Sequence, residues 1–137
     1  MANYKISEIE GIGPVYSQKL SEAGINTVND LLDKGAAKKG RAEVASATGI
    51  DEKIILKWVN MSELFRLKGI GSEYAELLEK AGVDTVKELR NRNADNLTEK
   101  MKEVNSEGRA LVRALPSANK VQQWIDDAKK LDPRVTY

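Results

Sequence analysis

Two short segments carry closely spaced glycines that could hold an anion with main-chain groups. Residues 9–14 read Ile-Glu-Gly-Ile-Gly-Pro, and residues 67–72 read Leu-Lys-Gly-Ile-Gly-Ser. Glycine allows a tight turn and lets a foreign group approach the backbone closely. If a helix follows each turn, its first N–H groups and the positive end of its dipole attract phosphate. The expected donors belong to two glycine turns, Gly11, Ile12 and Gly13 in the first and Gly69, Ile70 and Gly71 in the second.

Positive side chains near these turns and in one further cluster could add point charges to such a site. The clearest cluster spans residues 34–41, with four cations in eight residues on what reads as a flexible, glycine-containing connection. Such a cluster suits phosphate contact and salt-dependent binding, although a run of charge more commonly marks a solvated loop. The candidate cations are Lys19, Lys38, Lys39, Arg41, Lys53 and Lys68.

A purely structural role for the glycine turns stays open beside the phosphate site. Pro14 has no N–H to donate, and Glu73 would repel a phosphate at the second glycine turn. The turns could therefore serve packing alone, with Ile12 and Ile70 plugged between helices. A dinucleotide site or P-loop is disfavoured, because no strand is expected before either turn and no Gly-Lys-Ser/Thr follows.

Both glycine turns belong to an internal repeat. Residues 9–31 align with residues 67–89 at a constant offset of 58, and ten of the 23 positions are identical. Chance similarity between amphipathic helices would not also match three glycines and a threonine in register, so the repeat indicates a duplication. We expect a first unit over residues 1–61 and a second unit over residues 62–137, joined by a rigid helical segment.

The apolar spacing predicts helices throughout both units. Tyr16, Leu20 and Ala23 fall on one face of a helix, and the second unit repeats this spacing. Gly24 and Gly82 suit the left-handed position just beyond a helix end. Trp58 and Trp124 lie in the last expected helix of each unit and have apolar neighbours. We therefore expect both to pack in the core rather than stack on bases. The expected capping residues are Thr27, Asp51, Thr85 and Ser117.

This pattern resembles the helix-hairpin-helix family, whose signature is an apolar-x-Gly-apolar-Gly turn followed by an Ala- and Leu-rich helix. In that family, paired hairpins form a compact five-helix domain that binds DNA phosphates in the minor groove without sequence preference. The resemblance implies an all-α fold of two tandem helix-hairpin-helix domains of about five short helices each. It also makes residues 47–51, around Gly49, a degenerate second hairpin of the first unit, followed by Lys53. The second unit departs from the pattern over residues 105–116, where its paired hairpin is remodelled or absent.

The composition removes several classes of function. The 137 residues include no His and no Cys, which excludes disulfides, thiol nucleophiles, imidazole bases and the usual zinc or haem sites. We expect no enzymatic activity, no catalytic residue, no cofactor and no metal site. The 22 Lys and Arg nearly balance the 21 Asp and Glu, so any charge-driven binding must be local. No membrane-spanning or signal-like run is evident, so we expect no membrane partner and a cytoplasmic location.

The function expected from these features is sequence-independent binding of duplex or branched DNA through its phosphates. The alternative is a protein-interaction or assembly module that keeps the fold without binding nucleic acid. The near-neutral charge and Glu73 favour this alternative. A third option, an accessory subunit that delivers an enzyme to DNA, combines the two.

Overall fold

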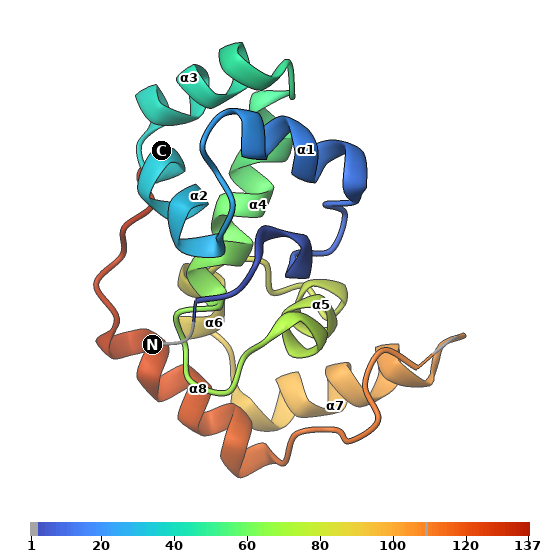
Figure 1. Ribbon diagram of the computed structural model, residues 1–137. Coiled ribbons are helices and arrows are strands. Elements are labelled where there is room, and N and C mark those ends of the chain that lie inside the picture. Colours follow the sequence, from blue (N-terminus) through green and yellow to red (C-terminus); the bar gives the residue numbers. More distant parts are fainter. Residues whose placement is uncertain (1–2, 109) are drawn as a thin grey trace.

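The computed structural model describes residues 3–108 and 110–137, and these residues form an all-α fold (Figure 1). Eight α-helices and a single 3-10 turn are found in these ranges, with no strand. The expected fold class, all-α, is therefore confirmed. The elements are η1 (Ile6–Glu8), α1 (Pro14–Glu22), α2 (Val28–Gly35), α3 (Lys38–Thr48), α4 (Glu52–Leu64), α5 (Ser72–Lys80), α6 (Val86–Arg90), α7 (Ala94–Ser106) and α8 (Ala118–Lys130).

Five helices begin at a side chain that accepts a hydrogen bond from one of the helix's own first amides. Such caps satisfy N–H groups that have no partner inside the helix. At α2, Thr27 Oγ1 accepts from the Asp30 amide at 3.1 Å, and the Asp30 carboxylate accepts from the Thr27 amide in return. The sequence predicts four of the caps and misses Asn93, which caps α7. The other three predicted caps are Asp51, Thr85 and Ser117.

The two tryptophans lie in the core, as predicted. Trp58 of α4 is 3% exposed and Trp124 of α8 is 1% exposed. Each indole packs against a tyrosine from the helix that follows a glycine turn, with ring centroids 5.1 Å apart for Tyr16 and Trp58 and 5.3 Å apart for Tyr74 and Trp124. Neither tryptophan is available as a stacking platform for bases.

The predicted boundary between the units falls inside one continuous helix. α4 runs through residues 61 and 62, and the side chains of residues 61–64 are all buried. Figure 1 shows α4 passing from the part built by α1–α3 to the part built by α5–α8. The buried apolar side chains of both units form one connected cluster, so the units pack directly against each other.

The end of the chain returns from the second unit to the first. After α8, residues 132–137 run beside α2, as the red segment in Figure 1 shows. We call these residues the C-terminal strap. The Thr136 amide donates to the Ala36 carbonyl at 2.7 Å, and the Tyr137 hydroxyl donates to Asn60 Oδ1 at 2.9 Å. No motif in the sequence predicts this path.

Gly40 of α3 packs against the end of α2 so tightly that a methyl group does not fit. A Cβ atom at Gly40 would lie 2.0 Å from the carbonyl oxygen of Lys34. Because that neighbour is backbone, α3 must move away from α2, and we expect Gly40→Ala to lower the free energy of unfolding by about 1–3 kcal/mol. Urea unfolding followed by circular dichroism measures this loss. Lys39→Ala, at an exposed position of the same helix, should change it by less than about 0.5 kcal/mol. Equal stability of the two variants would contradict the packing argument.

Candidate nucleic-acid interface

The two glycine turns share one backbone conformation. Gly11 and Gly69 have φ values of 93° and 88°, the left-handed region that favours glycine. The isoleucine that follows each of them is buried, as the sequence predicts. The Ile12 amide donates to the Ile9 carbonyl at 3.1 Å, and the Ile70 amide makes the same bond to Leu67 at 3.2 Å. The central amide of each turn is therefore used inside the protein, and only the flanking amides remain for a ligand.

The first glycine turn opens to solvent at the start of α1. A Cβ atom at Gly13 would meet no other group within 4 Å, and Val15 is 69% exposed. The first turn of α1 has no capping side chain and no acidic residue. Within the described part of the chain, no protein acceptor meets the amides of Gly13, Val15 or Tyr16. These three N–H groups and the helix dipole make this end of α1 suitable for an anion.

The second glycine turn has less favourable surroundings for an anion. The Cβ position of Gly71 lies 3.8 Å from the hydroxyl of Tyr4, which approaches from the start of the chain. A shallow pocket of about 360 Å³ at this turn is lined by the carboxyl-bearing residues Glu8 and Glu73. Both carboxylates would oppose a phosphate, since like charges repel. The sequence identified Glu73, but not Tyr4 or Glu8, because the fold brings them from elsewhere.

Lys120 of α8 is a candidate cation that sequence reasoning missed. Its Cε lies 3.6 Å from the Cβ position of Gly69, and its ammonium group lies 5.5 Å from the ring centre of Tyr74. An ammonium group over an aromatic ring is held by the negative face of that ring. The only sequence signal is that Lys120 lies four residues before Trp124, on the same face of α8.

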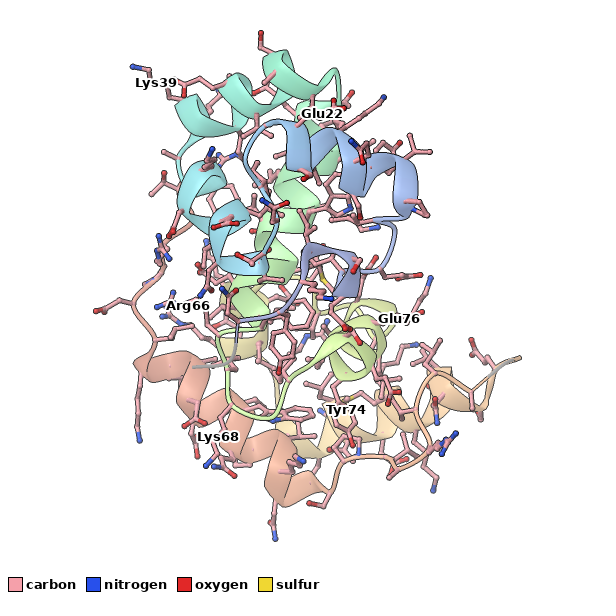
Figure 2. The ribbon with its side chains drawn as sticks, in the orientation of Figure 1. Glu22, Lys39, Arg66, Lys68, Tyr74 and Glu76 are labelled. Carbon is pink, nitrogen blue, oxygen red and sulfur yellow. The ribbon has the colours of Figure 1, made fainter. Side chains whose placement is uncertain are left out.

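The candidate lysines are exposed but do not form one continuous patch. Lys19 lies on α1, and Lys68 directly precedes the second glycine turn. Figure 2 shows Lys39 and Lys68 at opposite ends of the molecule. The structure does bring Lys38 of α3 and Lys53 of α4 together on one groove of about 530 Å³, although residues 51 and 52 add two carboxylates to its lining.

Gly49 forms the end of α3, where the resemblance implies a second hairpin. Its φ is 74°, and its amide donates to the Ala45 carbonyl at 2.8 Å, so this N–H group is already used. In the second unit, the corresponding connection is long and irregular. The side chain of Asn105 accepts hydrogen bonds there from the amides of Leu111 at 2.7 Å and Val112 at 3.1 Å. The two units therefore differ in the connection before their last helix.

Arg41 is not available to a phosphate, and its prediction as an exposed cation is wrong. The residue is 4% exposed, and its guanidinium donates to the carbonyls of Gly35 and Ala36, both at 2.9 Å, and of Thr136. The carbonyls at the end of a helix lack partners within it, and Arg41 supplies donors for those of α2. This role depends on how α3 turns back on α2, which the sequence does not specify.

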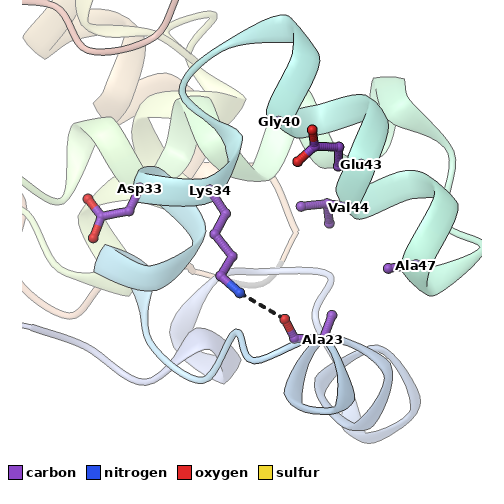
Figure 3. A pocket seen from close by; sticks show the side chains of 7 residues that line it. All are labelled: Ala23, Asp33, Lys34, Gly40, Glu43, Val44 and Ala47. Carbon is purple, nitrogen blue, oxygen red and sulfur yellow. Dashed lines mark hydrogen bonds between the residues drawn. The ribbon is translucent and has the colours of Figure 1, made fainter.

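The segment around residues 34–41 is also not a flexible connection. It forms the end of α2 and the start of α3, with a pocket of about 440 Å³ between them and the end of α1 (Figure 3). Lys34 Nζ donates across this pocket to the Ala23 carbonyl at 3.0 Å. Asp33 and Glu43 line the same pocket. Because of these carboxylates, this hollow does not suit a phosphate.

Carboxylates gather where the segment before the first glycine turn meets α5. Burial, together with the negative charge of Glu10 and a hydrogen bond that protonated Glu76 donates to it, raises the pKa of Glu76 above its ordinary value. On the same side, Lys57 forms an ion pair with Glu79 at 3.0 Å. An anion is therefore expected to bind at Gly13 and the start of α1 rather than beside Glu10.

Comparison with known proteins gives a family and one partial relative. The family model described as "Domain of unknown function (DUF4332)" matches residues 10–131. A stretch of 53 residues is 36% identical to the DNA repair and recombination protein RadA of Cenarchaeum symbiosum (strain A). This match covers 39% of the chain and 13% of RadA, so the chain spans only a small part of that relative. No solved structure matches the chain.

None of the helices within residues 3–108 and 110–137 is long and apolar enough to cross a membrane. No group of three or more His, Cys, Asp or Glu side chains in these ranges is arranged to hold a metal ion.

Replacement of Arg41 should destabilise the fold, because buried carbonyls would lose their donors. We expect Arg41→Ala to lower the free energy of unfolding by about 2–4 kcal/mol. Arg41→Lys should recover only part of this loss. Its ammonium group can still donate to a carbonyl, but it cannot replace all the N–H donors of the planar guanidinium. Lys38→Ala, at an exposed position of the same helix, is the control and should cost less than about 0.5 kcal/mol. If Arg41→Ala proved as stable as Lys38→Ala in urea unfolding, the structural role of Arg41 would be wrong.

Glu76 should make the protein less stable as the pH rises above its ordinary pKa of 4.5. Its pKa is higher in the folded chain, so the folded state binds the proton more tightly and loses stability as the proton leaves. Glu76→Gln should therefore stabilise the protein at pH 7. The gain should vanish well below pH 4.5, where the carboxyl is protonated in both states. Thermal unfolding at several pH values between pH 7 and well below pH 4.5 measures this gain in stability. Glu99→Gln, on the exposed face of α7, is the control.

Proposed function

Because the chain belongs to the DUF4332 family of domains of unknown function, its own geometry must indicate a role, and we propose that it binds DNA without sequence preference and without catalysis. The DNA is duplex or branched, and the contacts are to its phosphates, which position a protein without reading bases. The observation that carries this proposal is the open, uncapped start of α1 at the first glycine turn, where the described residues offer the amides of Gly13, Val15 and Tyr16 no acceptor and the first turn of α1 has no acidic residue. Such a helix end favours an anion.

The same proposal includes two tandem helix-hairpin-helix domains, over residues 1–61 and 62–137. Both glycine turns combine a left-handed glycine with a buried isoleucine, and each is followed by a helix of nine residues, α1 or α5. Each unit also closes with a helix of 13 residues, α4 or α8, whose buried tryptophan packs beside the turn. These matched features support a common architecture for the two units.

The partial similarity to RadA supports an association with DNA. That relative is named a DNA repair and recombination protein, and the 53 similar residues are close in length to the repeat offset of 58. The similar stretch is about as long as one unit. It therefore suits a module that contacts DNA, while the activity of the whole relative stays outside the proposal.

The contacts are unequal in the two units. At the first glycine turn, the amides of Gly13, Val15 and Tyr16 donate to phosphate, with Lys19 of the same helix adding charge. Lys38 and Lys53 contact further phosphates from the groove between α3 and α4, and Lys39 adds a contact from an exposed position of α3. The second glycine turn contributes through Lys68 and Lys120, against the opposing carboxylates of Glu8 and Glu73.

Binding to a fluorescently labelled duplex of random sequence, followed by anisotropy, tests the proposal. Contact with about three to five phosphates gives a log–log salt slope of about −3 to −4.5. Val15→Glu gives α1 a carboxylate at the position where α5 has Glu73. It should weaken DNA binding by about fivefold or more. Val15→Gln, similar in size but uncharged, should remain within about twofold. A dissociation constant weaker than about 10⁻⁴ M at low salt would rule out DNA binding.

Charge reversal of the candidate lysines on α3 and α4 separates their contribution to DNA binding from that of the first glycine turn in the same titration. Exchange of Lys38, Lys39 and Lys53 for Glu should reduce the salt slope by about two to three, one for each lost phosphate contact. Arg41 is left in place because it is buried. The matched control replaces three exposed lysines elsewhere with Glu. These lysines are Lys102, Lys129 and Lys130. Equal effects of the two sets would mean that only net charge matters.

A protein-interaction module is the second candidate, and the second glycine turn favours it. Glu8 and Glu73 line the pocket there, in a chain whose formal net charge is only +1. A partner with basic side chains would suit that surface better than DNA. Loss of DNA binding in the titration, together with self-association in light scattering, would favour this second role.

A further inference from the structure

The C-terminal strap joins the two units by contacts at both of its ends. At its start, the Asp132 carbonyl accepts a hydrogen bond from the guanidinium of Arg66, just beyond α4, at 2.9 Å. At its far end, the Thr136 amide donates to the Ala36 carbonyl of the first unit at 2.7 Å. The strap follows α8 in the chain at its start and is hydrogen-bonded to the first unit at its far end. It therefore spans the junction between the units.

The middle of the strap is attached through a buried carboxylate. The Arg134 amide donates to Glu63 Oε2 at 3.1 Å, and Glu63 is only 5% exposed. Glu63 also forms an ion pair with Arg66 at 3.6 Å, so one carboxylate of α4 contacts both Arg66 and the strap. Val135 is buried beside this point. The attachment therefore does not depend on the exposed ion pair of Arg134 with Asp33, a kind of contact that contributes little by itself.

The last two residues of the strap cover the junction of α2 and α3. The Thr136 carbonyl accepts from the buried guanidinium of Arg41, which lies 5.9 Å from the ring centre of Tyr137. Tyr137 also lines the groove that carries Lys38 and Lys53. Release of the strap would therefore both uncover Arg41 and remove one wall of this groove.

We propose that the C-terminal strap is a lock that holds the two units in one relative orientation. Without it, the units remain joined through α4 and through the connected apolar core, beside which lie the ring contact of Tyr4 with Phe65 and the ion pair of Lys57 with Glu79. The strap adds hydrogen bonds from Thr136 to Ala36 and from Tyr137 to Asn60 of the first unit, between residues that are 77 to 100 positions apart. It thereby fixes the spacing of the two glycine turns. The inference does not rest on DNA binding.

Two introduced cysteines allow the orientation to be measured, because the chain has none of its own. Ser46→Cys on α3 and Lys102→Cys on α7 are exposed positions in different units, and nitroxide labels there report a distance distribution by pulsed electron resonance. Arg134→Pro with Thr136→Pro removes the two strap amides that donate to the first unit and to Glu63, without touching a helix. This change should broaden the distribution by about twofold or more, as rigid bodies released from a lock move collectively.

The control is Asp132→Ala, because only the main-chain carbonyl of this residue is used and its side chain is exposed. It should keep the narrow distribution of the parent chain. Circular dichroism reports whether each variant keeps its helices. If the double-proline chain loses helix, Thr136→Pro alone, which removes only the amide that donates to the Ala36 carbonyl of the first unit, is measured in its place. An unchanged distribution in the variant that keeps its helices overturns the lock.

Discussion

Each glycine turn depends on close contact with a buried indole. The Cβ position of Gly11 lies 3.7 Å from Nε1 of Trp58, and that of Gly69 lies 3.4 Å from Nε1 of Trp124. Because both glycines also have a left-handed φ, a larger residue there would strain the backbone beside the indole. The tryptophan comes from the last helix of its unit, so this contact joins the start of each unit to its end. The direction of α1 and α5, and what their first amides face, follows from this packing.

The same backbone nevertheless produces two different surfaces. At the start of α1, Val15 faces solvent and no acidic side chain stands in the first turn, whereas α5 has Glu73 at the equivalent position. Gly13 has open space around it, while Gly71 faces the hydroxyl of Tyr4. A turn conserved in geometry can therefore attract an anion in one unit and oppose it in the other. Packing specifies where the amides lie, and the neighbouring side chains decide which charge can approach them.

Local features of the fold could be read from the sequence, and long-range contacts could not. Caps such as Thr27 and left-handed residues such as Gly24 depend on groups within a few positions, and both lie where they are predicted. The burial of the two tryptophans follows from apolar spacing alone. Arg41 was misassigned because its partners include Thr136, 95 residues away. Lys120 was missed for the same reason, since it reaches the second glycine turn only through the packing of α8.

The uses found for these cations explain why a count of basic residues overstates the positive surface. Lys34, Arg41, Arg90 and Arg92 each donate to carbonyl groups at helix ends, where the negative end of the helix dipole attracts them. A guanidinium directed at its own protein's carbonyls has fewer donors left for a phosphate. The positive charge that remains for an anion therefore lies on exposed lysines, beside the amides of the first glycine turn. An interface of this kind has modest, strongly salt-dependent affinity, and its strength depends on how many such groups one duplex can reach at once. The relative placement of the two units, and with it the C-terminal strap, then sets that number.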